Sequence, residues 1–509
     1  MSVVLINPNL LAQRSDLFTT GIVYMPIGLA YVAASLREAG LRPTVIDAYG
    51  EAPQRTRKEG KFLAFGLTVD EVVDRVPGDA ALVVLYANQV SNTQSILDLL
   101  RGIKAAMPGL PVVILENTQA VTAFALKPVA PLFFQAGADY ALTGEAEESV
   151  CRLARAMGRG EPASSVPGLI GPTFTNPPGT GADLDSLPLP AWDLFPVKNY
   201  WATHYAHGPL STGRYLPLLT SRGCPYPCKF CVVPATNGQR WRARSPENVV
   251  AEMEQFMRQF GVREFHVEDL DPTIDDRRTR KFCELLIEKS LNVVWKIVAG
   301  TKVETIRSEE TIDLMAASGC RYISISPESG SPRVLKLMSK PFKIDHAVRL
   351  IHRMNRVGIR SQACFVLGFP GETDEDRALT VGMVHDLTRN GVDEIALFII
   401  SPVPGSAIFD QFSGYQSLSE LNFTPTWRED YPALAKLRLR LYAKFLWWKV
   451  RHHPLKVVRQ AVNFLHRRFE TKMEMVPYRA AVYRWLGLWA RPAPRAVGPA
   501  AQSEQRQAA

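Results

Sequence analysis

Cysteine is scarce in this sequence, which contains seven cysteines among 509 residues. A secreted disulfide framework would use more of them at regular intervals, so we expect a reducing, cytoplasmic setting. The first residues, MSVVLINPNLL, lack the basic and apolar regions that make up a signal peptide. Because no run of about 18 consecutive apolar residues occurs, we expect no membrane-spanning helix.

Histidine is absent from residues 1–203, and acidic residues are nearly absent near the other end of the chain. Residues 436–495 contain fifteen Lys or Arg but only two acids, Glu470 and Glu474, which gives this region a net charge of +13. The whole chain has a formal charge of +9, so the rest of it is slightly acidic, at −4. The basic character therefore belongs to one C-terminal region and says little about the body of the protein.

The first part of the chain alternates short β-type runs with helical patterns. Helices are predicted over residues 26–40 and 93–106, and buried parallel strands over 3–7, 43–47, 81–86, 111–116 and 139–144. This alternation predicts an α/β fold with an open, doubly wound sheet over residues 1–155. Ligands of such sheets bind at the carboxyl ends of the strands.

A second series of alternating elements follows a stretch that is rich in Pro, Gly and Ser. We expect residues 156–214 to form an extended interdomain connection with little regular structure. Six further βα units over residues 215–425 suit a partial (β/α)6 barrel, with strands predicted over 216–221, 264–269, 293–299, 322–328, 362–368 and 394–400. The end of the chain is predicted to be a basic, aromatic helical region over 426–490 and a disordered tail over 491–509.

Three of the seven cysteines crowd into the segment RGCPYPCKFCVVP, residues 222–234. Cys224, Cys228 and Cys231 have the spacing C-x3-C-x2-C, directly after the first predicted barrel strand. Structural zinc sites use four ligands, and no histidine or fourth cysteine lies close by, although a zinc knuckle stays open as an alternative. On a [4Fe–4S] cube, three thiolates leave one iron without a protein ligand, and that iron can bind a cosubstrate directly.

The C-x3-C-x2-C motif after the first strand of a six-unit barrel resembles the radical S-adenosylmethionine (SAM) superfamily. This resemblance implies that the three thiolates hold a [4Fe–4S] cluster whose open iron chelates SAM. It further implies reductive cleavage of SAM to a 5′-deoxyadenosyl radical, which abstracts hydrogen from the substrate. A reducing partner such as flavodoxin or ferredoxin is implied as well. The chain's own part is to ligate the cluster, orient SAM and exclude water.

Other barrel segments match the same family and suggest SAM contacts. Phe230 resembles the aromatic residue that packs near the adenine, and HVEDLDPTIDD (266–276) resembles the acidic segment after the second strand, with a solvated acidic loop as the alternative. ISPESGSPRVLKLMSK (325–340) and FVLGFPGET (365–373) resemble the family's fourth-strand and fifth-strand segments. The further SAM contacts implied by these matches are Glu268, Asp269, Ser326, Glu328, Val366, Leu367 and Gly368.

The N-terminal sheet, with YMPIGLAYVAASLREAG (24–40) after its first strand, resembles the cobalamin-binding domain of B12-dependent radical SAM enzymes. The resemblance implies cobalamin contacts from Asn7, Ser91, Thr93, Asn117, Thr118 and Gly144. The chain departs from the family where ILENTQA (114–120) replaces a glycine-rich turn, at Tyr86, where a small residue is common, and in its lack of a histidine that could bind cobalt. A degenerate domain that only supports substrate binding is the alternative.

Together these features predict a cobalamin-dependent radical SAM enzyme that methylates an unactivated carbon of a small-molecule or lipid-like substrate. Radical oxidation, cyclisation or rearrangement without net methyl transfer is the runner-up, and a non-catalytic metal-binding protein is the candidate from another class. Methylthiotransferases of transfer RNA hold a second cluster on three cysteines of their N-terminal domain. They are set aside because only one cysteine, Cys151, precedes Cys224 in this chain.

Three interpretations of the basic tail stay open. The first is a helical cap on the barrel, the second is a membrane-surface region that places the protein peripherally at the membrane, and the third is a nucleic-acid contact. The last is the least favoured of the three.

Overall fold

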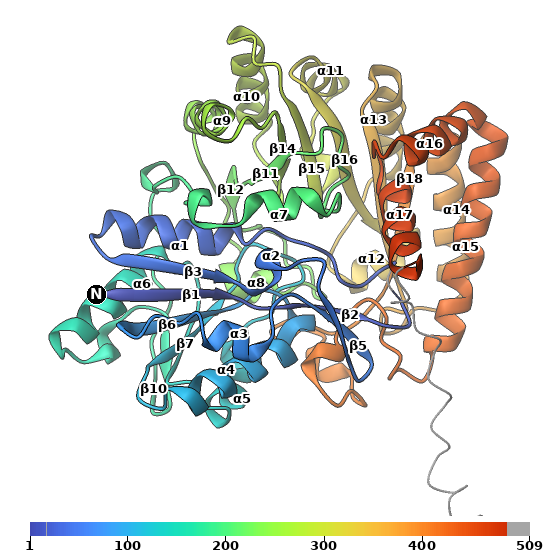
Figure 1. Cartoon of the computed structure of the whole chain (residues 1–509). Helices are drawn as coiled ribbons and strands as arrows, with labels where there is room; N and C mark the ends of the chain where they lie inside the picture. Colours follow the sequence, from blue (N-terminus) through green and yellow to red (C-terminus); the bar gives the residue numbers. More distant parts are fainter. Residues whose placement is uncertain (17, 486–509) are drawn as a thin grey trace, which may run out of the picture.

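The computed structural model describes residues 1–16 and 18–485, so the tail predicted to be disordered over 491–509 lies outside the described residues. Two sheets built mainly from parallel strands dominate the molecule (Figure 1), and the expected α/β class is confirmed. The first sheet belongs to the N-terminal part of the chain and the second to residues 215–399. The C-terminal helices stand beside the second sheet.

The first sheet has seven strands in the order β10-β9-β8-β7-β6-β1-β3. Five of its strands are parallel: β1 (Ser2–Asn7), β3 (Arg42–Asp47), β6 (Ala80–Ala87), β7 (Val112–Glu116) and β8 (Tyr140–Leu142). Three of them, β1, β6 and β7, are made of Val, Leu and Ile runs that are buried on both faces, as parallel sheets require. The main connecting helices are α1 (Ile27–Glu38), α4 (Thr93–Ala106), α5 (Ala130–Gln135) and α6 (Glu147–Arg159).

The second sheet has six strands, all parallel and in chain order. The strands are β11 (Tyr215–Leu218), β14 (Glu264–Val267), β15 (Val294–Thr301), β16 (Cys320–Glu328), β17 (Arg360–Leu367) and β18 (Glu394–Ile399). The helices between them are α9 (Pro246–Phe260), α10 (Asp276–Glu288), α11 (Glu309–Ala317), α12 (Pro332–Leu337), α13 (Ile344–Val357) and α14 (Asp374–Arg389). Several begin at a polar cap, such as Ser245 before α9 and the Thr373 capping box of α14.

The connecting segment contains more regular structure than its composition predicts. Residues Leu169–Gly171 (β9) and Phe174–Thr175 (β10) extend the first sheet, with β9 antiparallel to β8. A short helix, α7 (Val197–Ala202), packs back on the N-terminal part, where the Tyr200 hydroxyl donates to the Asp47 carboxylate over 2.8 Å. The segment therefore belongs to the packed body, and one cluster of buried apolar side chains runs from β1 through it to the second sheet.

A small antiparallel sheet was not predicted at all. It pairs β2 (Leu10–Gln13) with β5 (Phe62–Phe65) and β5 with β4 (Thr56–Glu59). The predicted strand over 216–221 is also divided, because β11 ends at Leu218 and a two-residue strand, β12 (Ser221–Arg222), pairs with β13 (Arg242–Ala243).

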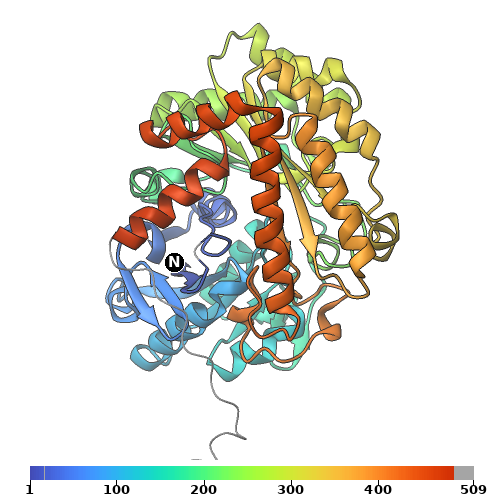
Figure 2. The same cartoon turned by 90° about the vertical axis from the view of Figure 1, so that its right-hand side faces the viewer.

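Three helices end the described chain: α15 (Tyr431–His452), α16 (Pro454–His466) and α17 (Lys472–Trp485). Helix α15 packs on α14 and β18 through Leu434, Leu441 and Phe445, which are fully buried. Figure 2 shows α15 and α16 on the face turned to the viewer, with no other element in front of them. Within residues 1–16 and 18–485, no helix combines the length and the apolarity needed to cross a membrane.

Candidate functional site

The three cysteines lie in the loop between β12 and α8 (Val233–Asn237), beyond the carboxyl end of β11. The buried Asp269 carboxylate holds the start of this loop, since it accepts the Thr220 N–H (2.7 Å), the Thr220 hydroxyl (2.7 Å) and the Ser221 hydroxyl (2.6 Å). Gly223 has a φ of +80°, and a Cβ there would stand 1.8 Å from the Arg240 carbonyl oxygen. The loop path therefore requires glycine at this position.

The thiols lie in an apolar cradle. Cys228 is buried, and Cys224 and Cys231 are half-buried against Val232, Val233, Leu270 and Ala125. Burial raises the pKa of Cys224 and of Cys231 to about 12 and also raises the pKa of Cys228. Such thiols are protonated without metal, and ligation must displace their protons.

The donor set fits an iron–sulfur cube better than a single ion. In the part of the chain that the structure describes, no three His, Cys, Asp or Glu side chains are grouped as ligands of one metal ion. A tetrahedral zinc ion needs its ligands to converge on one point, whereas a cube takes each thiolate on a different iron. Three cysteine thiols on one loop match the second arrangement.

Lys340 is the residue beside the thiols that sequence reasoning missed. Its ammonium group forms an ion pair with the Glu328 carboxylate (2.5 Å) and stands 5.8 Å from the centre of the Phe230 ring. The positive charge of Lys340 acts against the raised pKa of all three thiols, and at Cys228 it is the main influence that opposes burial. The carboxylate of Glu328 and the thiols in turn raise the pKa of Lys340. The lysine ends the quoted segment ISPESGSPRVLKLMSK, but nothing in its spacing indicates that the chain folds back to the cysteines.

Phe230 and Val366 belong to one apolar cluster. Phe230 packs on a small apolar cluster that contains Val366 at the end of β17, with Val334, Met338, Phe369, Ile400 and Ile408. Leu367 accepts the Ile400 N–H through its carbonyl (3.0 Å) and is buried in the sheet. Ser326 is half-buried on β16, and its hydroxyl lies 2.7 Å from where a Cβ on Gly300 would stand.

Gly368, also a predicted SAM contact, has partners within the protein. Its N–H donates to Glu372 (2.7 Å), and its carbonyl accepts from Arg428 (3.0 Å). A Cβ at this position would meet Leu434 of α15 at 2.4 Å. The glycine therefore permits the close approach of the C-terminal helix.

Glu268 and Asp269 also have partners within the protein. The Glu268 carboxylate lies 2.6 Å from Nδ1 of His207, whose ring contacts Tyr24 at a centroid distance of 4.4 Å. Burial lowers the pKa of His207 and raises that of Tyr24. Both acids are buried, so neither belongs to a solvated acidic loop. Asp269 binds Thr220 and Ser221 and thereby holds the residues that lead into the cysteine loop.

Residues proposed for cobalamin gather at the carboxyl edge of the first sheet. Asn7 donates to Asp47 (2.8 Å) and accepts from Asn88 (3.0 Å), and Asn117 donates to the carbonyl of the same Asn88 (2.8 Å). The hydroxyl of Thr93 is turned inward to the Val90 carbonyl (2.7 Å). Ser91 lines a cavity of about 50 Å³ between this edge and the loop after β18.

Glu116 takes the place of the glycine-rich turn at the end of β7. Its buried carboxylate accepts the N–H of Leu126 (2.8 Å) and of Gly144 (2.9 Å), and burial raises its pKa to about 7. The hydroxyl of Tyr86 lies over Gly28 at the start of α1, 2.7 Å from where a Cβ would stand. Glu116 thus joins two of the loops that carry proposed cobalamin contacts.

The two sheets' carboxyl edges meet at the cysteine loop. The Asn237 side chain donates to the Thr118 carbonyl (3.0 Å), and the Ala125 N–H donates to the Pro404 carbonyl (2.9 Å). Ala125 also packs in the cluster that cradles Cys224 and Cys231. The loop after β7 therefore reaches from the N-terminal sheet directly to the candidate cluster site.

A buried arginine also connects the cysteine loop to the N-terminal sheet and its helices. Arg222, two residues before Cys224, forms ion pairs with Glu147 (2.6 Å) and Glu145 (3.2 Å) at the start of α6. Its guanidinium also stands 5.1 Å from the centre of the Tyr31 ring on α1. The cysteine loop is thereby tied to the N-terminal sheet.

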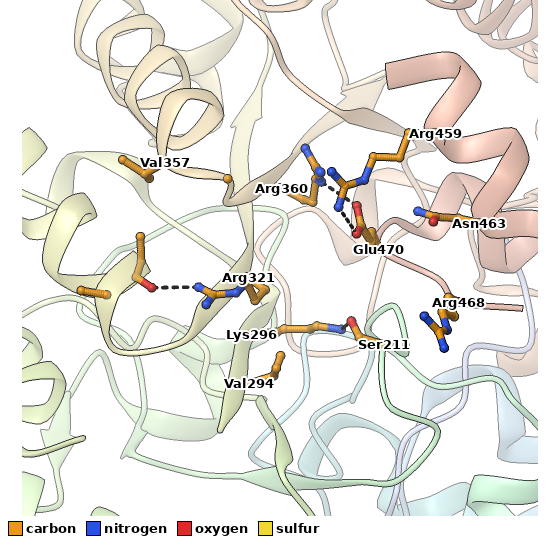
Figure 3. A pocket seen from close by; sticks show the side chains of 13 residues that line it. Ser211, Val294, Lys296, Arg321, Val357, Arg360, Arg459, Asn463, Arg468 and Glu470 are labelled. Carbon is orange, nitrogen blue, oxygen red and sulfur yellow. Dashed lines mark hydrogen bonds and ion pairs between the residues drawn. The ribbon is translucent and has the colours of Figure 1, made fainter. Parts of the chain in front are cut away.

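A cavity of about 890 Å³ lies away from this site. Figure 3 shows it at the amino ends of β15, β16 and β17, where basic side chains converge on Glu470. Because chemistry in parallel α/β folds occurs at the carboxyl ends of the strands, we place the candidate active site at the cysteine loop.

Comparisons with known proteins agree with this assignment. Residues 218–384 match the family model described as the Radical SAM superfamily. Cytidylyl-2-hydroxyethylphosphonate methyltransferase of Streptomyces wedmorensis is 27% identical over 452 residues, which cover 80% of this chain and 80% of that protein. The chain thus carries a radical SAM domain, as its cysteine motif predicts.

Solved structures share the fold. TsrM from Kitasatospora setae is a radical S-adenosylmethionine methyltransferase solved with cobalamin and a [4Fe–4S] cluster bound. It matches with a TM-score of 0.62 and 18% identity over 82% of this chain and 76% of its own. The cobalamin-dependent S-adenosylmethionine radical enzyme OxsB, with aqua-cobalamin bound, matches with a TM-score of 0.57 and 16% identity over 86% of this chain and 56% of its own.

Proposed function

Since residues 218–384 form a radical SAM domain, we propose that the protein is a cobalamin-dependent radical SAM methyltransferase that acts on an unactivated carbon. We assign the seven-stranded sheet as a Rossmann-like cobalamin module and the six-stranded sheet as a partial barrel. The observation that carries the proposal is the contact between the loop after β7 and the cysteine loop, through Thr118 and Ala125. A methyl donor held at the first site and a radical generated at the second must face one substrate.

Cys224, Cys228 and Cys231 would hold the cluster, with Asp269 fixing the loop that bears them. When bound, the cluster and SAM supply the hydrogen-abstracting radical, and cobalamin supplies the methyl group. The amino and carboxylate groups of SAM carry opposite charges, and the Glu328–Lys340 pair offers one charge for each next to the thiols. Phe230 and Val366 form an apolar surface for the adenine, and Ser326 offers a hydroxyl to the ribose.

The carboxyl edge of the first sheet would receive the corrin. Cobalamin carries amide side chains around its ring, and these need hydrogen-bond partners. Among the described residues, the Gln119 side-chain oxygen and the Ser401 hydroxyl are buried without a partner. Ser401 lines the same interface cavity as Ser91. Unpartnered polar atoms at this edge and in the facing loop after β18 fit a bound polar ring, because a buried polar group without a partner costs free energy.

The substrate class proposed is a small molecule or a lipid-like molecule, since the site lies between two packed domains. A flavodoxin or ferredoxin would supply electrons, because reduction of the cluster needs an external donor. We propose a cytoplasmic location. Radical oxidation, cyclisation or rearrangement with the same cofactors is the second candidate function, favoured by the same interdomain contact.

Anaerobic reconstitution with iron, sulfide and hydroxocobalamin tests the proposal. The ultraviolet–visible spectrum of the gel-filtered protein is expected to show cluster and corrin bands together. A protein that retains the cluster but no corrin would contradict the cobalamin assignment. Equimolar 5′-deoxyadenosine and S-adenosylhomocysteine from SAM would indicate methyl transfer, whereas deoxyadenosine alone would indicate the second candidate function.

A further inference from the structure

Large apolar side chains are exposed mainly on two neighbouring helices. Of the thirteen exposed large apolar residues in the described chain, eight lie between residues 439 and 465, on α15 and α16. They are Leu439, Leu446, Trp447, Val450, Leu455, Val458, Val462 and Leu465. A surface that gathers such residues marks an interaction site, whereas scattered ones need no explanation.

Helix α16 is turned with its apolar side outward. Leu455, Val458, Val462 and Leu465 recur at intervals of three or four residues, which places them on one side of the helix, and Leu455 and Leu465 are 81% and 76% exposed. No residue of α16 is buried. A helix that belonged to the protein core would bury this stripe.

The polar side of α16 holds it to the protein. Lys456 binds the Gly391 carbonyl (2.6 Å) and Asp393 (2.9 Å), and Arg459 pairs with Glu470 (2.5 Å). Gln460 and Asn463 bond to Thr471 (2.9 Å) and Glu474 (3.2 Å). Apart from the edge contact of Phe464 with the Tyr478 ring at a centroid distance of 6.0 Å, these contacts of α16 with the body are polar, so its orientation is built into the fold.

Helix α15 continues the same pattern on its outer side. Leu434, Leu441 and Phe445 face the body, whereas Leu439, Leu446, Trp447 and Val450 face solvent. Exposed cationic side chains lie along this outward side, at Lys436, Arg440, Lys444 and Arg451. Both helices lie on the face of the molecule seen in Figure 2.

The charge around these stripes is of one sign. Residues 431–469 contain ten Lys or Arg and no Asp or Glu. Beneath α16, the cavity of about 890 Å³ adds Arg321 and Arg360 to Arg459 and Arg468, against the single acid Glu470 (Figure 3). Arg360, Lys456 and Arg459 are paired with Asp393 or Glu470. The apolar stripes are therefore bordered mainly by the outward cations of α15, Lys436, Arg440, Lys444 and Arg451, which are exposed to solvent.

We propose that the outer faces of α15 and α16 bind an anionic lipid surface, with the apolar stripes entering the interface and the basic residues contacting headgroup phosphates. Outward apolar side chains, flanking cations and an exposed Trp447 are the features of helices that lie in a membrane interface. This inference stands independently of the chemistry at the cysteine loop.

A second copy of the chain fits this surface poorly. A two-fold dimer brings the same patch of each subunit together. Here it would place two sets of cations with no acids among residues 431–469 against each other, and like charges across an interface oppose association. An anionic lipid surface supplies the missing negative charge and accepts apolar side chains without demanding a matching shape.

Cosedimentation of the full chain with vesicles tests the proposal. We expect binding at low salt to vesicles of phosphatidylcholine with phosphatidylglycerol and much weaker binding to phosphatidylcholine alone. Leu455→Gln combined with Leu465→Gln should weaken the partition about tenfold or more. Arg440→Gln combined with Lys444→Gln and Arg451→Gln should weaken it about tenfold and reduce its salt dependence.

The matched control is Leu379→Gln, an equally apolar exposed residue on α14 that lies outside the surface, and it should bind as the wild type does. All substituted side chains are exposed, so unchanged melting temperatures are expected to show that the variants fold. The proposal is overturned if the wild type does not bind anionic vesicles at low salt. It is also overturned if the paired leucine variant binds as well as the wild type, or if these substitutions only dissociate a dimer.

Discussion

Lys340 and Glu328 form a buried ion pair with an N–O distance of 2.5 Å, next to the thiols of Cys228 and Cys231. Glu328 adopts a φ of +64°, in the left-handed region that a residue with a side chain rarely occupies, at a register irregularity between β16 and β17. Such backbone strain is held in place by its surroundings and is common at functional sites. Here it accompanies a carboxylate that meets the lysine beside the candidate cluster.

Replacing Lys340 by Met should make the reconstituted cluster harder to reduce, because a positive charge beside an iron–sulfur cluster favours its reduced form. The apparent KM for SAM should rise about tenfold as a charged partner is lost. A redox titration followed by electron paramagnetic resonance measures the first effect, and deoxyadenosine formation against SAM concentration measures the second. Lys336→Met, an exposed lysine of α12 near the same site, should change neither. Equal effects in both variants would remove Lys340 from the site.

Asp269→Asn should loosen the cysteine loop, because an amide cannot accept all three donors from Thr220 and Ser221. The iron retained per chain after anaerobic reconstitution and gel filtration should fall at least about twofold, since a mobile loop positions its thiols poorly. Asp345→Asn, an exposed position on α13, serves as the control. Full iron retention by the Asp269 variant would show that the loop holds its shape without this carboxylate.

Arg222→Ala should lower the stability of the whole protein by about 3–5 kcal/mol, because it leaves Glu147 buried without its partner. The exposed pair Arg152–Glu148 on the same helix gives the contrast, and Arg152→Ala should cost about 0.5 kcal/mol or less. Thermal unfolding of the two variants under identical conditions compares them. Similar melting temperatures would mean that the ion pairs of Arg222 with Glu145 and Glu147 contribute little to the stability of the protein.

The pH dependence of stability should report Glu116. Burial raises the pKa of its carboxyl group to about 7 in the folded protein, above its ordinary value of about 4.5. The folded state therefore binds more protons between these values, and the stability contributed by this group falls as pH rises through that window. Glu116→Gln does not titrate there. The melting-temperature difference between wild type and this variant should change in the variant's favour from pH 5 to pH 8, and a constant difference would contradict the assignment.

Local patterns predicted most of the elements. The helix expected over residues 93–106 forms over Thr93–Ala106, since its apolar residues repeat with helical spacing and bury one side. Strands β2, β4 and β5 were missed because they pair antiparallel with one another and stand outside the alternation of strands and helices that carried the other predictions. The strands in the connecting segment were missed because the pairing of β9 with β8, and of β10 with β9, is set by the fold and leaves no signal in local composition.

The candidate site was predictable only where the sequence itself brings residues together. The cysteines share one loop, so their spacing carries the signal. Glu268 meets His207 from 61 residues away, and Asp269 meets Thr220 from 49 residues away, so their partners depend on the assembled sheet. Lys340 reaches the thiols for the same reason.

Formation of 5′-deoxyadenosine from SAM by the anaerobically reconstituted protein, with a strong reductant, tests the central claim most directly. The account predicts deoxyadenosine that depends on protein and reductant and is abolished in Cys224→Ala. Protein that carries a full complement of cluster iron and binds SAM, yet forms no deoxyadenosine, would contradict it.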